Sequence, residues 1–361
     1  MTTSTLLTDA PSAPAARAKK SGGSFWRYLV VRFLLIIPTI FILVTLVFFL
    51  MRSTGDPITA ALGGRLSADQ IAERVHEAGY DRPLFLQYFE YLGQIFTGNF
   101  GSAISDNRPV TEILLTYGAA TLELAFYALI VAFIVGIPLG MVAAYYRDKR
   151  PDAGLRIFAI LWYATPVFFA GLLLKLIFSV WLDWFPVAGR ASTGAEIEMQ
   201  SVPNPTNIYL IDAFRTGNAD VVMDVLSHAV LPAVALGLLT AGIFLRLVRA
   251  NVIGTLSMDY VESARSRGVS EFRLVHKHAY RPALIPIITV IGLQIALLLG
   301  GAVLTETTFE WKGLGFQLVQ YLQARDYVAV QGIVILLAVI VAVTNFVVDI
   351  IAALIDPRVR Y

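Results

Sequence analysis

Cysteine is absent from this chain of 361 residues, which excludes disulfides, thiolate nucleophiles and cysteine-based metal sites. The only histidines are His76, His228, His276 and His278, and none stands in a carboxylate-rich cluster. The sequence also lacks the phosphate-loop motif G-x-x-x-x-G-K-[ST], the zinc motif H-E-x-x-H and the nucleophile motif G-x-S-x-G. We therefore expect no catalytic residues, no bound metal or cofactor, and no ATP hydrolysis by this chain alone.

Charge is also sparse. Lys, Arg, Asp and Glu make up 15% of the residues, against about 25% in a typical soluble domain. Hydrophobic residues make up 57%, and the mean hydropathy is +0.69. The net charge of +2 is too small to predict nucleic-acid binding. This composition predicts an all-α integral membrane protein whose main solvent is the lipid bilayer.

Long apolar runs are abundant. A helix needs about 20 apolar residues to cross a bilayer, and six segments qualify: roughly Leu29–Met51, Tyr117–Tyr146, Ile157–Trp181, Leu226–Val248, Leu284–Thr305 and Val328–Ile355. Most contain a proline (Pro38, Pro138, Pro166, Pro232 and Pro286), which predicts bent helices packed against neighbours. The expected fold is one six-span domain over residues 25–361, preceded by a disordered tail, residues 1–24.

Lysine and arginine are distributed unevenly. They gather in the N-terminal flank, the connection between the second and third spans, the central loop 249–283 and the C-terminus, which share one side of a six-span arrangement. The connections on the other side, residues 52–116 and 182–225, are longer and richer in acid. The positive-inside rule places the basic side in the cytoplasm. We expect a multi-pass protein of the plasma or inner membrane with both termini cytoplasmic.

The two acidic connections differ in their expected structure. Ser67 is placed to cap a helix that runs to Ala78, and the aromatic segment 83–92 suits the membrane interface. Residues 182–225 contain scattered glycine and proline and are predicted to be irregular, with the apolar run 208–211 folding back over the bundle. Docking of a soluble delivery protein and simple covering of helix ends explain such a surface equally well.

The central loop carries the densest local signals. Asp259 followed by Glu262 is an Asp version of the capping box, which predicts a helix start. Gly268 stands where that helix needs a left-handed residue at its end. Ser270 is placed to cap a second short helix, which Pro282 ends or bends into the next span. The prediction is a helix, a glycine turn and a second helix on the membrane surface.

This loop resembles a known motif. Glu262-Ser263-Ala264, then Gly268, then Leu284-Ile285-Pro286, resembles the EAA loop of ABC-transporter permeases, with Ser263 in place of an alanine. In that family the loop forms a coupling helix that docks into a groove on a separate ATPase. The resemblance implies an ATPase-coupling role for Asp259, Glu262, Ser263, Ala264, Arg265, Arg267 and Gly268. An ordinary cytoplasmic loop, basic because of topology, is the plainer interpretation.

Landmarks over nearly all of residues 25–361 resemble one branch of this family. They include Gly55-Asp56-Pro57, Asp81-Arg82-Pro83-Leu84, Gly98-Asn99-Phe100-Gly101, Gly313-Leu314-Gly315 and Asp356-Pro357-Arg358-Val359. Together they resemble the B-type permease subunit of dipeptide, oligopeptide and nickel importers. The resemblance implies a type I ABC importer permease fold with six transmembrane helices and a cytoplasmic coupling helix, in a subunit that moves short peptides across the cytoplasmic membrane.

The resemblance also implies partners. These are a homologous C-type permease that completes a twelve-span heterodimer, two ATPase domains or subunits that hold ATP and Mg²⁺, and an extracytoplasmic solute-binding protein. Closure of the ATPases on ATP would swing the spans between inward-open and outward-open states. Nickel complexes, haem-like ligands and glutathione are alternative cargoes within the family.

Polar and aromatic residues in or beside the spans are candidates for a transport pathway or gate. Glu123 and Lys175 are expected at similar depth near the outer ends of their spans, where they pair or line the pathway; snorkelling is the alternative for Lys175. Gln294 faces a pathway or bonds a neighbouring helix. The other candidates lie at the end of the fifth span and in the turn beyond it, and form an outer gate or seat this turn: Glu306, Phe309 and Trp311.

An ion-coupled secondary carrier is the alternative from another class. It requires charges on a central pathway and a strong internal repeat. The embedded charges lie mostly near span ends, and no clear inverted repeat is visible. A structural or receptor-like membrane protein would leave the capped helix pair unexplained. Only the importer predicts a stoichiometric ATPase partner.

Overall fold

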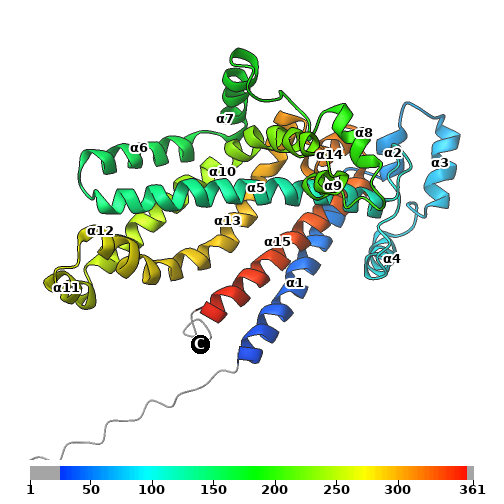
Figure 1. Cartoon of the computed structure of the whole chain (residues 1–361). Coiled ribbons are helices and arrows are strands. Elements are labelled where there is room, and N and C mark those ends of the chain that lie inside the picture. The colour runs from blue at the N-terminus through cyan, green and yellow to red at the C-terminus, as the bar shows by residue number, and fades with distance from the viewer. Residues whose placement is uncertain (1–24, 356–361) are drawn as a thin grey trace, which may run out of the picture.

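The computed structural model describes residues 25–355, and these residues form a helical bundle with two isolated β-bridges and no β-strand (Figure 1). The predicted disordered tail and the Asp356–Val359 landmark lie outside the described residues. The longest helices are α1 (Phe25–Arg52), α5 (Val110–Tyr145), α10 (Ala219–Leu256), α13 (Tyr280–Phe309) and α15 (Tyr327–Ile355). The shorter elements are α2 (Pro57–Leu62), α3 (Ala68–Glu77), α4 (Leu84–Phe96), α6 (Arg150–Ala164), α7 (Val167–Leu174), η1 (Lys175–Trp181), α8 (Thr193–Gln200), α9 (Tyr209–Thr216), α11 (Asp259–Ser266), α12 (Glu271–Arg273), η2 (Leu274–Ala279) and α14 (Leu314–Gln323).

Helices α5 and α10 form the centre of the fold and run along one another, with α6 and α13 beside them (Figure 1). Their backbones approach closely at glycines. A Cβ on Gly237 would lie 2.6 Å from the carbonyl oxygen of Ala128, and one on Gly136 would lie 2.7 Å from that of Ala241. Small residues allow this kind of contact between apolar helices, where packing replaces the hydrophobic effect. The central pair therefore provides a rigid frame for the rest of the chain.

The prediction of six spans is met in part. By length and composition, α1, α5, α10 and α15 can each cross a membrane, and a fifth span is counted if the bent pair of α6 with α7 and η1 is taken as one. The predicted fifth span, 284–305, lies within α13, and some of its side chains fall outside the described residues. Within α13, the apolar stretch Leu293–Phe309 is shorter than the other spans.

The predicted third span, Ile157–Trp181, is not one continuous helix. It is broken between α6 and α7, which are bent by 105°. Thr165 takes an extended conformation at the break, and Pro166 follows it. A proline disfavours helical geometry in the residue before it, so the chain turns there. Three other prolines (Pro38, Pro138 and Pro232) lie within unbroken helices.

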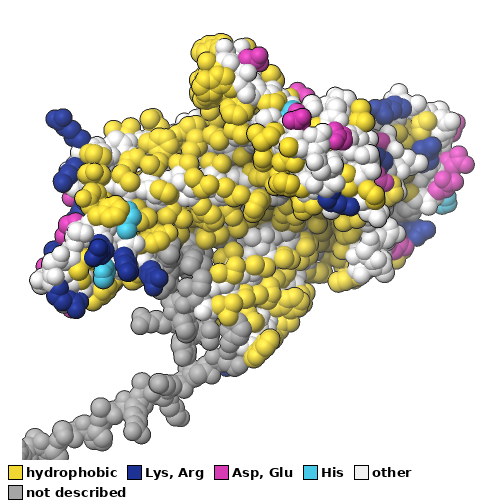
Figure 2. Space-filling view, viewed as in Figure 1, with side chains coloured by type: hydrophobic (Ala, Val, Ile, Leu, Met, Phe, Trp, Pro, Cys, Tyr) yellow, Lys and Arg dark blue, Asp and Glu magenta, His cyan; other side chains and the backbone are white. Residues whose placement is uncertain are grey.

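The two ends of the long helices carry different structures (Figure 1). At one end stand α11 and α12, which we call the hairpin (Asp259–Arg273). At the opposite end lie α2, α3 and α4. Figure 2 shows lysine and arginine side chains around the hairpin, acidic and basic side chains at the opposite end, and a broad apolar surface between them.

The structure of the connection 52–116 was predicted well from local sequence, and that of the connection 182–225 was not. Ser67 caps α3 as expected, in a capping box with Gln70. Residues 182–225 are not irregular throughout, because they contain α8 and α9. Ser192 caps α8 and Gly217 ends α9 in the left-handed region, with a φ of +74°. A serine N-cap and a glycine helix end are local signals for helices, and they were overlooked because this segment also contains scattered glycine and proline.

Candidate functional site

The first helix of the hairpin begins where the sequence predicted, but not through the predicted capping box. Met258 occupies the N-cap position without a side-chain cap bond, and Asp259 is the first helical residue. Glu262 lies one position too late for the box, and its carboxylate binds Arg265 at 2.5 Å instead. The two acids nevertheless lie in the first turn, where they stabilise the positive end of the helix dipole.

The end of α11 confirms the predicted role of Gly268, which has a φ of +82°. The Gly268 N–H donates to the Arg265 carbonyl at 2.9 Å, and the Val269 N–H donates to the Ala264 carbonyl at 3.3 Å. This pair of bonds is a Schellman motif. A residue with a side chain is strained in this conformation, so glycine fixes the point where the chain reverses.

One face of α11 is packed against the rest of the protein. Val261 and Ala264 are buried and contact Leu274 and Val269. Ser263 lies on the exposed face, and its hydroxyl donates to the Asp259 carbonyl at 2.9 Å. The serine that replaces alanine therefore satisfies its own hydroxyl within the helix. Arg267 is also exposed and donates from Nε to the Ser263 carbonyl at 3.2 Å.

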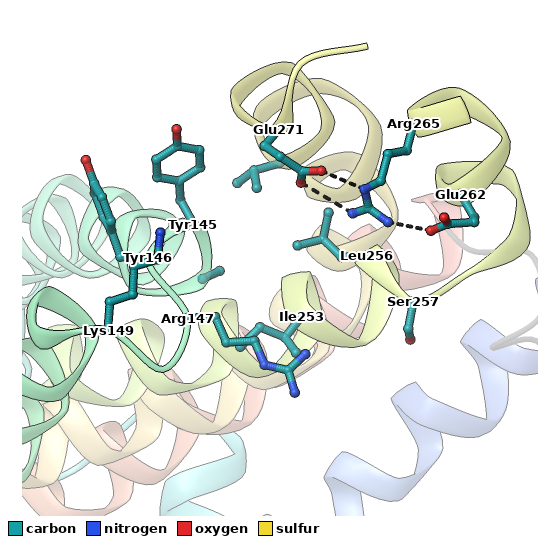
Figure 3. A pocket seen from close by; sticks show the side chains of 12 residues that line it. Tyr145, Tyr146, Arg147, Lys149, Ile253, Leu256, Ser257, Glu262, Arg265 and Glu271 are labelled. Atoms are coloured by element: carbon teal, nitrogen blue, oxygen red, sulfur yellow. Dashed lines mark hydrogen bonds and ion pairs between the residues drawn. The ribbon is translucent and has the colours of Figure 1, made fainter. Parts of the chain in front are cut away.

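Arg265 joins the two helices of the hairpin (Figure 3). Its Nε donates to Glu271 Oε1 at 2.6 Å, its Nη2 to Glu271 Oε2 at 3.3 Å, and its Nη1 to Glu262. The hydrogen bond to Glu271 is the main cause that raises the pKa of the Arg265 guanidinium. Because these groups are exposed, the contact adds little to global stability. Its consequence is geometric: it holds α11 and α12 at a fixed angle.

Of the two outcomes predicted at Pro282, an end to the second helix or a passage into the next span, the structure shows the second. Residues from Glu271 to Phe309 form one unbroken run through α12, η2 and α13. Proline cannot donate to the carbonyl four residues earlier, which is that of His278. The Tyr260 hydroxyl of α11 reaches this carbonyl oxygen at 3.4 Å. Ser270 takes the N-cap position but makes no side-chain cap bond.

A groove of about 670 Å³ separates the hairpin from the connection between α5 and α6. Figure 3 shows Tyr145, Tyr146 and Lys149 on one side and the Arg265 contact on the other. Aromatic and charged side chains on two rigid walls suit a segment of a protein partner. No group of His, Asp or Glu that could hold a metal ion occurs among the described residues.

A buried ion pair ties the first turn of α6, directly after the α5–α6 connection, to α10, the helix that leads into the hairpin. Arg249 donates from Nε to Asp152 Oδ1 at 2.6 Å and from Nη2 to Oδ2 at 2.7 Å. The Asp152 side chain is fully buried, and that of Arg249 is 20% exposed. Both walls of the groove are therefore anchored to one helix.

We predict that Asp152→Asn lowers the free energy of unfolding by ~2 kcal/mol, because it removes the buried negative charge against the Arg249 guanidinium and leaves only the more distant carboxylate of Asp148, at 4.0 Å. Titration of the purified chain with sodium dodecyl sulfate measures this loss. Arg147→Gln is the matched control, since its pair with Asp148 is exposed on both sides and should contribute almost nothing. Equal losses of unfolding free energy in the two variants would show that the Asp152–Arg249 pair contributes no more than an exposed pair, and would contradict its role as a buried anchor.

The candidates at the opposite end form a buried cluster rather than the predicted pair of Glu123 with Lys175. Glu123 binds Arg190 Nη2 at 2.5 Å and accepts the backbone N–H of Leu210 at 2.8 Å and of Tyr209 at 3.2 Å. Lys175 instead donates to the Thr308 carbonyl at 3.1 Å. The pairing prediction was wrong because the connection between η1 and α8 supplies a nearer cation, Arg190.

Arg190 was missed by sequence reasoning. Its side chain is 5% exposed, and its guanidinium stacks 3.6 Å from the Tyr209 ring centroid. A signal was present, because Arg190 is the only lysine or arginine between Lys175 and Arg215. It was overlooked because only the folded chain brings it to α5. The run 208–211 does fold back over the bundle, through these bonds to Glu123.

The turn beyond α13 is packed onto α5. Trp311 is fully buried and donates from Nε1 to the Ala120 carbonyl at 2.9 Å. Glu306 is also buried and accepts from the Thr121 hydroxyl at 2.7 Å. A Cβ on Gly313 would lie 2.4 Å from Glu306 Oε1, so a side chain there would displace the buried carboxylate. Phe309 is 2% exposed.

Gln294 lies on α13 and is 3% exposed. Its Oε1 has no hydrogen-bond partner among the described residues. A buried amide oxygen without a donor is costly, so this oxygen is available to a group outside the described chain. Whether Gln294, or the packed residues of the preceding cluster, face a transport pathway stays a prediction.

These observations define a class: a helical membrane protein with a rigid, capped hairpin and an adjoining groove at one end of its long helices. The chain belongs to the family of inner-membrane components of binding-protein-dependent transport systems. Residues 136–361 match the model of that component, and residues 25–118 match the model of its N-terminal part. It is thus a multi-pass membrane protein of a family that works with separate ATPase and binding-protein partners.

Several relatives cover nearly the whole chain. A di/tripeptide transport system permease protein, DppB, of Pseudomonas aeruginosa is 40% identical over 91% of this chain and 96% of its own length. The dipeptide transport system permease protein DppB of Escherichia coli is 36% identical over 93% and 99%. The glutathione transport system permease protein GsiC of Salmonella choleraesuis is 34% identical over 92% and 99%.

Proposed function

We propose that this chain is the permease subunit of an ABC importer for short peptides, driven by separate ATPase subunits. The observation that carries the proposal is the hairpin, in which a Schellman turn and the Arg265 contact fix two helices at one angle. A part that transmits force from a partner must keep its shape under load. The names of the relatives with 36–40% identity support peptides as cargo.

The exposed face of α11 is the proposed ATPase contact. Glu262, Ser263 and Arg267 are exposed on it, whereas Val261 and Ala264 anchor it to the bundle. Asp259 and Gly268 set where the helix begins and ends. ATP and Mg²⁺ are bound by the ATPases in this account, and their closure moves the hairpin. Because α10 leads into α11 and α13 follows α12, that motion reaches the long helices directly.

The proposed orientation places the hairpin and both termini in the cytoplasm and α2–α4 outside. The concentration of lysine and arginine around the hairpin supports this orientation. The outer surface then meets the solute-binding protein, and a homologous C-type permease completes the pathway. Glu123, Lys175, Gln294, Glu306, Phe309 and Trp311 remain the candidates that shape that pathway or its outer gate.

Co-purification tests the proposal. The chain is isolated from its native membrane in a mild detergent, and the co-eluting proteins are identified and assayed for ATPase activity. A second six-span protein together with ATPase subunits is the expected result. A stable homo-oligomer without ATPase would refute the proposal and favour an ion-coupled carrier.

Cargo is tested on the same complex in proteoliposomes with its binding protein. Uptake of a labelled dipeptide that depends on ATP is expected, and unlabelled di- and tripeptides should compete for it. Glutathione is included as a competitor because a glutathione permease is 34% identical. Uptake of glutathione or nickel without uptake of dipeptides would contradict the peptide assignment and leave the importer class intact.

A further inference from the structure

A second cavity lies at the end opposite the hairpin and has a volume of about 310 Å³. It is lined by the last turn of α1, by Ile58 of α2, by the turn before α4, by α4 and the segment 99–104 after it, and by the start of α15. None of its lining residues belongs to the hairpin or to the Glu123 cluster. We call it the Arg52 cavity. Its volume is at the lower end of the range for small-molecule sites, about 300–1,000 Å³.

Buried polar atoms without partners are concentrated around this cavity. The described residues contain eight buried side-chain nitrogen or oxygen atoms that lack a hydrogen-bond partner. Four of them belong to residues that line the Arg52 cavity: Arg52 Nε, Gln87 Oε1, Tyr91 OH and Gln331 Nε2. Buried polar groups are nearly always paired in folded proteins. A concentration of four at one place indicates that a polar molecule supplies the missing partners.

The cavity also carries a positive charge that no carboxylate neutralises. The Arg52 guanidinium forms no ion pair or hydrogen bond among the described residues, and it lies 4.3 Å from the Tyr80 ring centroid and 5.4 Å from that of Phe48. Glu90 also lines the cavity, but its carboxylate is bound by Arg82 at 2.9 Å. The two rings hold the guanidinium in place without satisfying its charge.

The amide groups in the walls are held rigidly. Gln87 is 9% exposed, and its Nε2 donates to the carbonyls of Tyr80 at 3.0 Å and Arg82 at 2.8 Å. These bonds fix the amide, so Oε1 is left as the unpaired acceptor. Gln331 is 6% exposed and contributes an unpaired donor from α15. The site is thus prebuilt, with three kinds of donor and one acceptor.

We propose that the Arg52 cavity binds a small molecule with an oxyanion, either a carboxylate or a phosphate group. Arg52 is the counter-ion, and the Tyr91 hydroxyl and the Gln331 amide are further donors. Gln87 Oε1 accepts from an amino or hydroxyl group of the same molecule. A free solute and a phospholipid head group share this chemistry. The site is distinct from the proposed ATPase contact, so it does not depend on the proposed function.

Thermal unfolding of the full chain in an uncharged detergent tests the site, since a ligand that binds the folded state raises Tm with its concentration. Glycylglycine supplies a carboxylate, inorganic phosphate a free phosphate, and dihexanoyl phosphatidylglycerol a lipid phosphate. Chloride at equal ionic strength is the reference. At least one probe should raise Tm in a saturable way, and the probe that does so identifies the source.

Two variants change the site by different means. Arg52→Gln removes the charge and should weaken the effective probe at least about tenfold, because a hydrogen bond to a charged group is lost. Gln331→Leu removes one amide donor and should weaken it several-fold. Arg65→Gln is the control, since Arg65 is an exposed arginine outside the cavity and should leave the affinity unchanged.

The possible results separate clearly. Stabilisation by a probe that needs a higher probe concentration in both cavity variants and is unchanged in Arg65→Gln supports the site. A cavity that holds only water would give no stabilisation beyond that of chloride, and the proposal would then be wrong. Stabilisation that is unchanged in both cavity variants would place the binding elsewhere and would equally overturn it.

Discussion

Gly268→Val is expected to lower ATP-driven uptake at least about tenfold while leaving the chain in the membrane. Gly268 has a φ of +82°, and a β-branched residue there brings roughly 1–2 kcal/mol of strain. That is comparable to the free energy that keeps an exposed turn closed. The Schellman bonds would open, and the two helices of the hairpin would lose their fixed angle. Uptake and ATP hydrolysis by the reconstituted complex are measured together.

Gly64→Val is the control that separates the effect of backbone strain from the loss of the coupling role. Gly64 also has a positive φ, +88°, and open space around its Cβ position, but it lies in the turn between α2 and α3. Gly64→Val should therefore carry similar strain and leave hydrolysis coupled to uptake. Glu262→Lys should reproduce the loss by opposing Arg265 with a like charge. Normal uptake by both hairpin variants would count against the coupling role.

Glu123→Leu is expected to lower the free energy of unfolding by about 3–5 kcal/mol, the cost of breaking a buried ion pair. The change leaves Arg190, whose side chain is 5% exposed, without its carboxylate. It also leaves the backbone N–H groups of Tyr209 and Leu210 without their acceptor. The loss is measured by titrating the purified chain with sodium dodecyl sulfate.

A double-mutant cycle shows whether the loss belongs to the pair. Removing both charges, by Glu123→Leu with Arg190→Met, should cost clearly less than the sum of the two single changes, because no unpaired charge stays buried. Glu90→Gln is the control, since its pair with Arg82 is about half exposed and should be worth under about 1 kcal/mol. Additive losses in the cycle would refute a direct interaction.

Features governed by neighbouring residues could be predicted from the sequence. Gly268 and Ser67 act within a few residues of their own positions, so the turn and the cap followed from residue type alone. The capping box at Asp259 failed because the helix begins one residue earlier, with Met258 as N-cap, which puts Glu262 one position past the box, where its carboxylate binds Arg265. One local rule does not decide which of two nearby partners an exposed side chain takes.

Features governed by distant residues could not be predicted. Arg190 meets Glu123 across 67 positions of the chain, and no periodicity links them. Proline also had unequal effects. Pro166 ends a helix, whereas the helix continues at Pro282, where the carbonyl of His278 gains a bond from Tyr260 on α11. The outcome depends on whether another helix can satisfy the carbonyl that proline leaves free.

Single-cysteine cross-linking tests the central claim most directly, because the chain has no cysteine of its own. Ser263→Cys places one thiol on the exposed face of α11, and Ser201→Cys places one at the end of α8. The native complex is treated with a bifunctional maleimide, and the cross-linked partners are identified. The account predicts that Ser263→Cys captures an ATPase subunit and that Ser201→Cys does not. Capture of an ATPase only from Ser201→Cys, or from neither position in a complex that contains one, would contradict it.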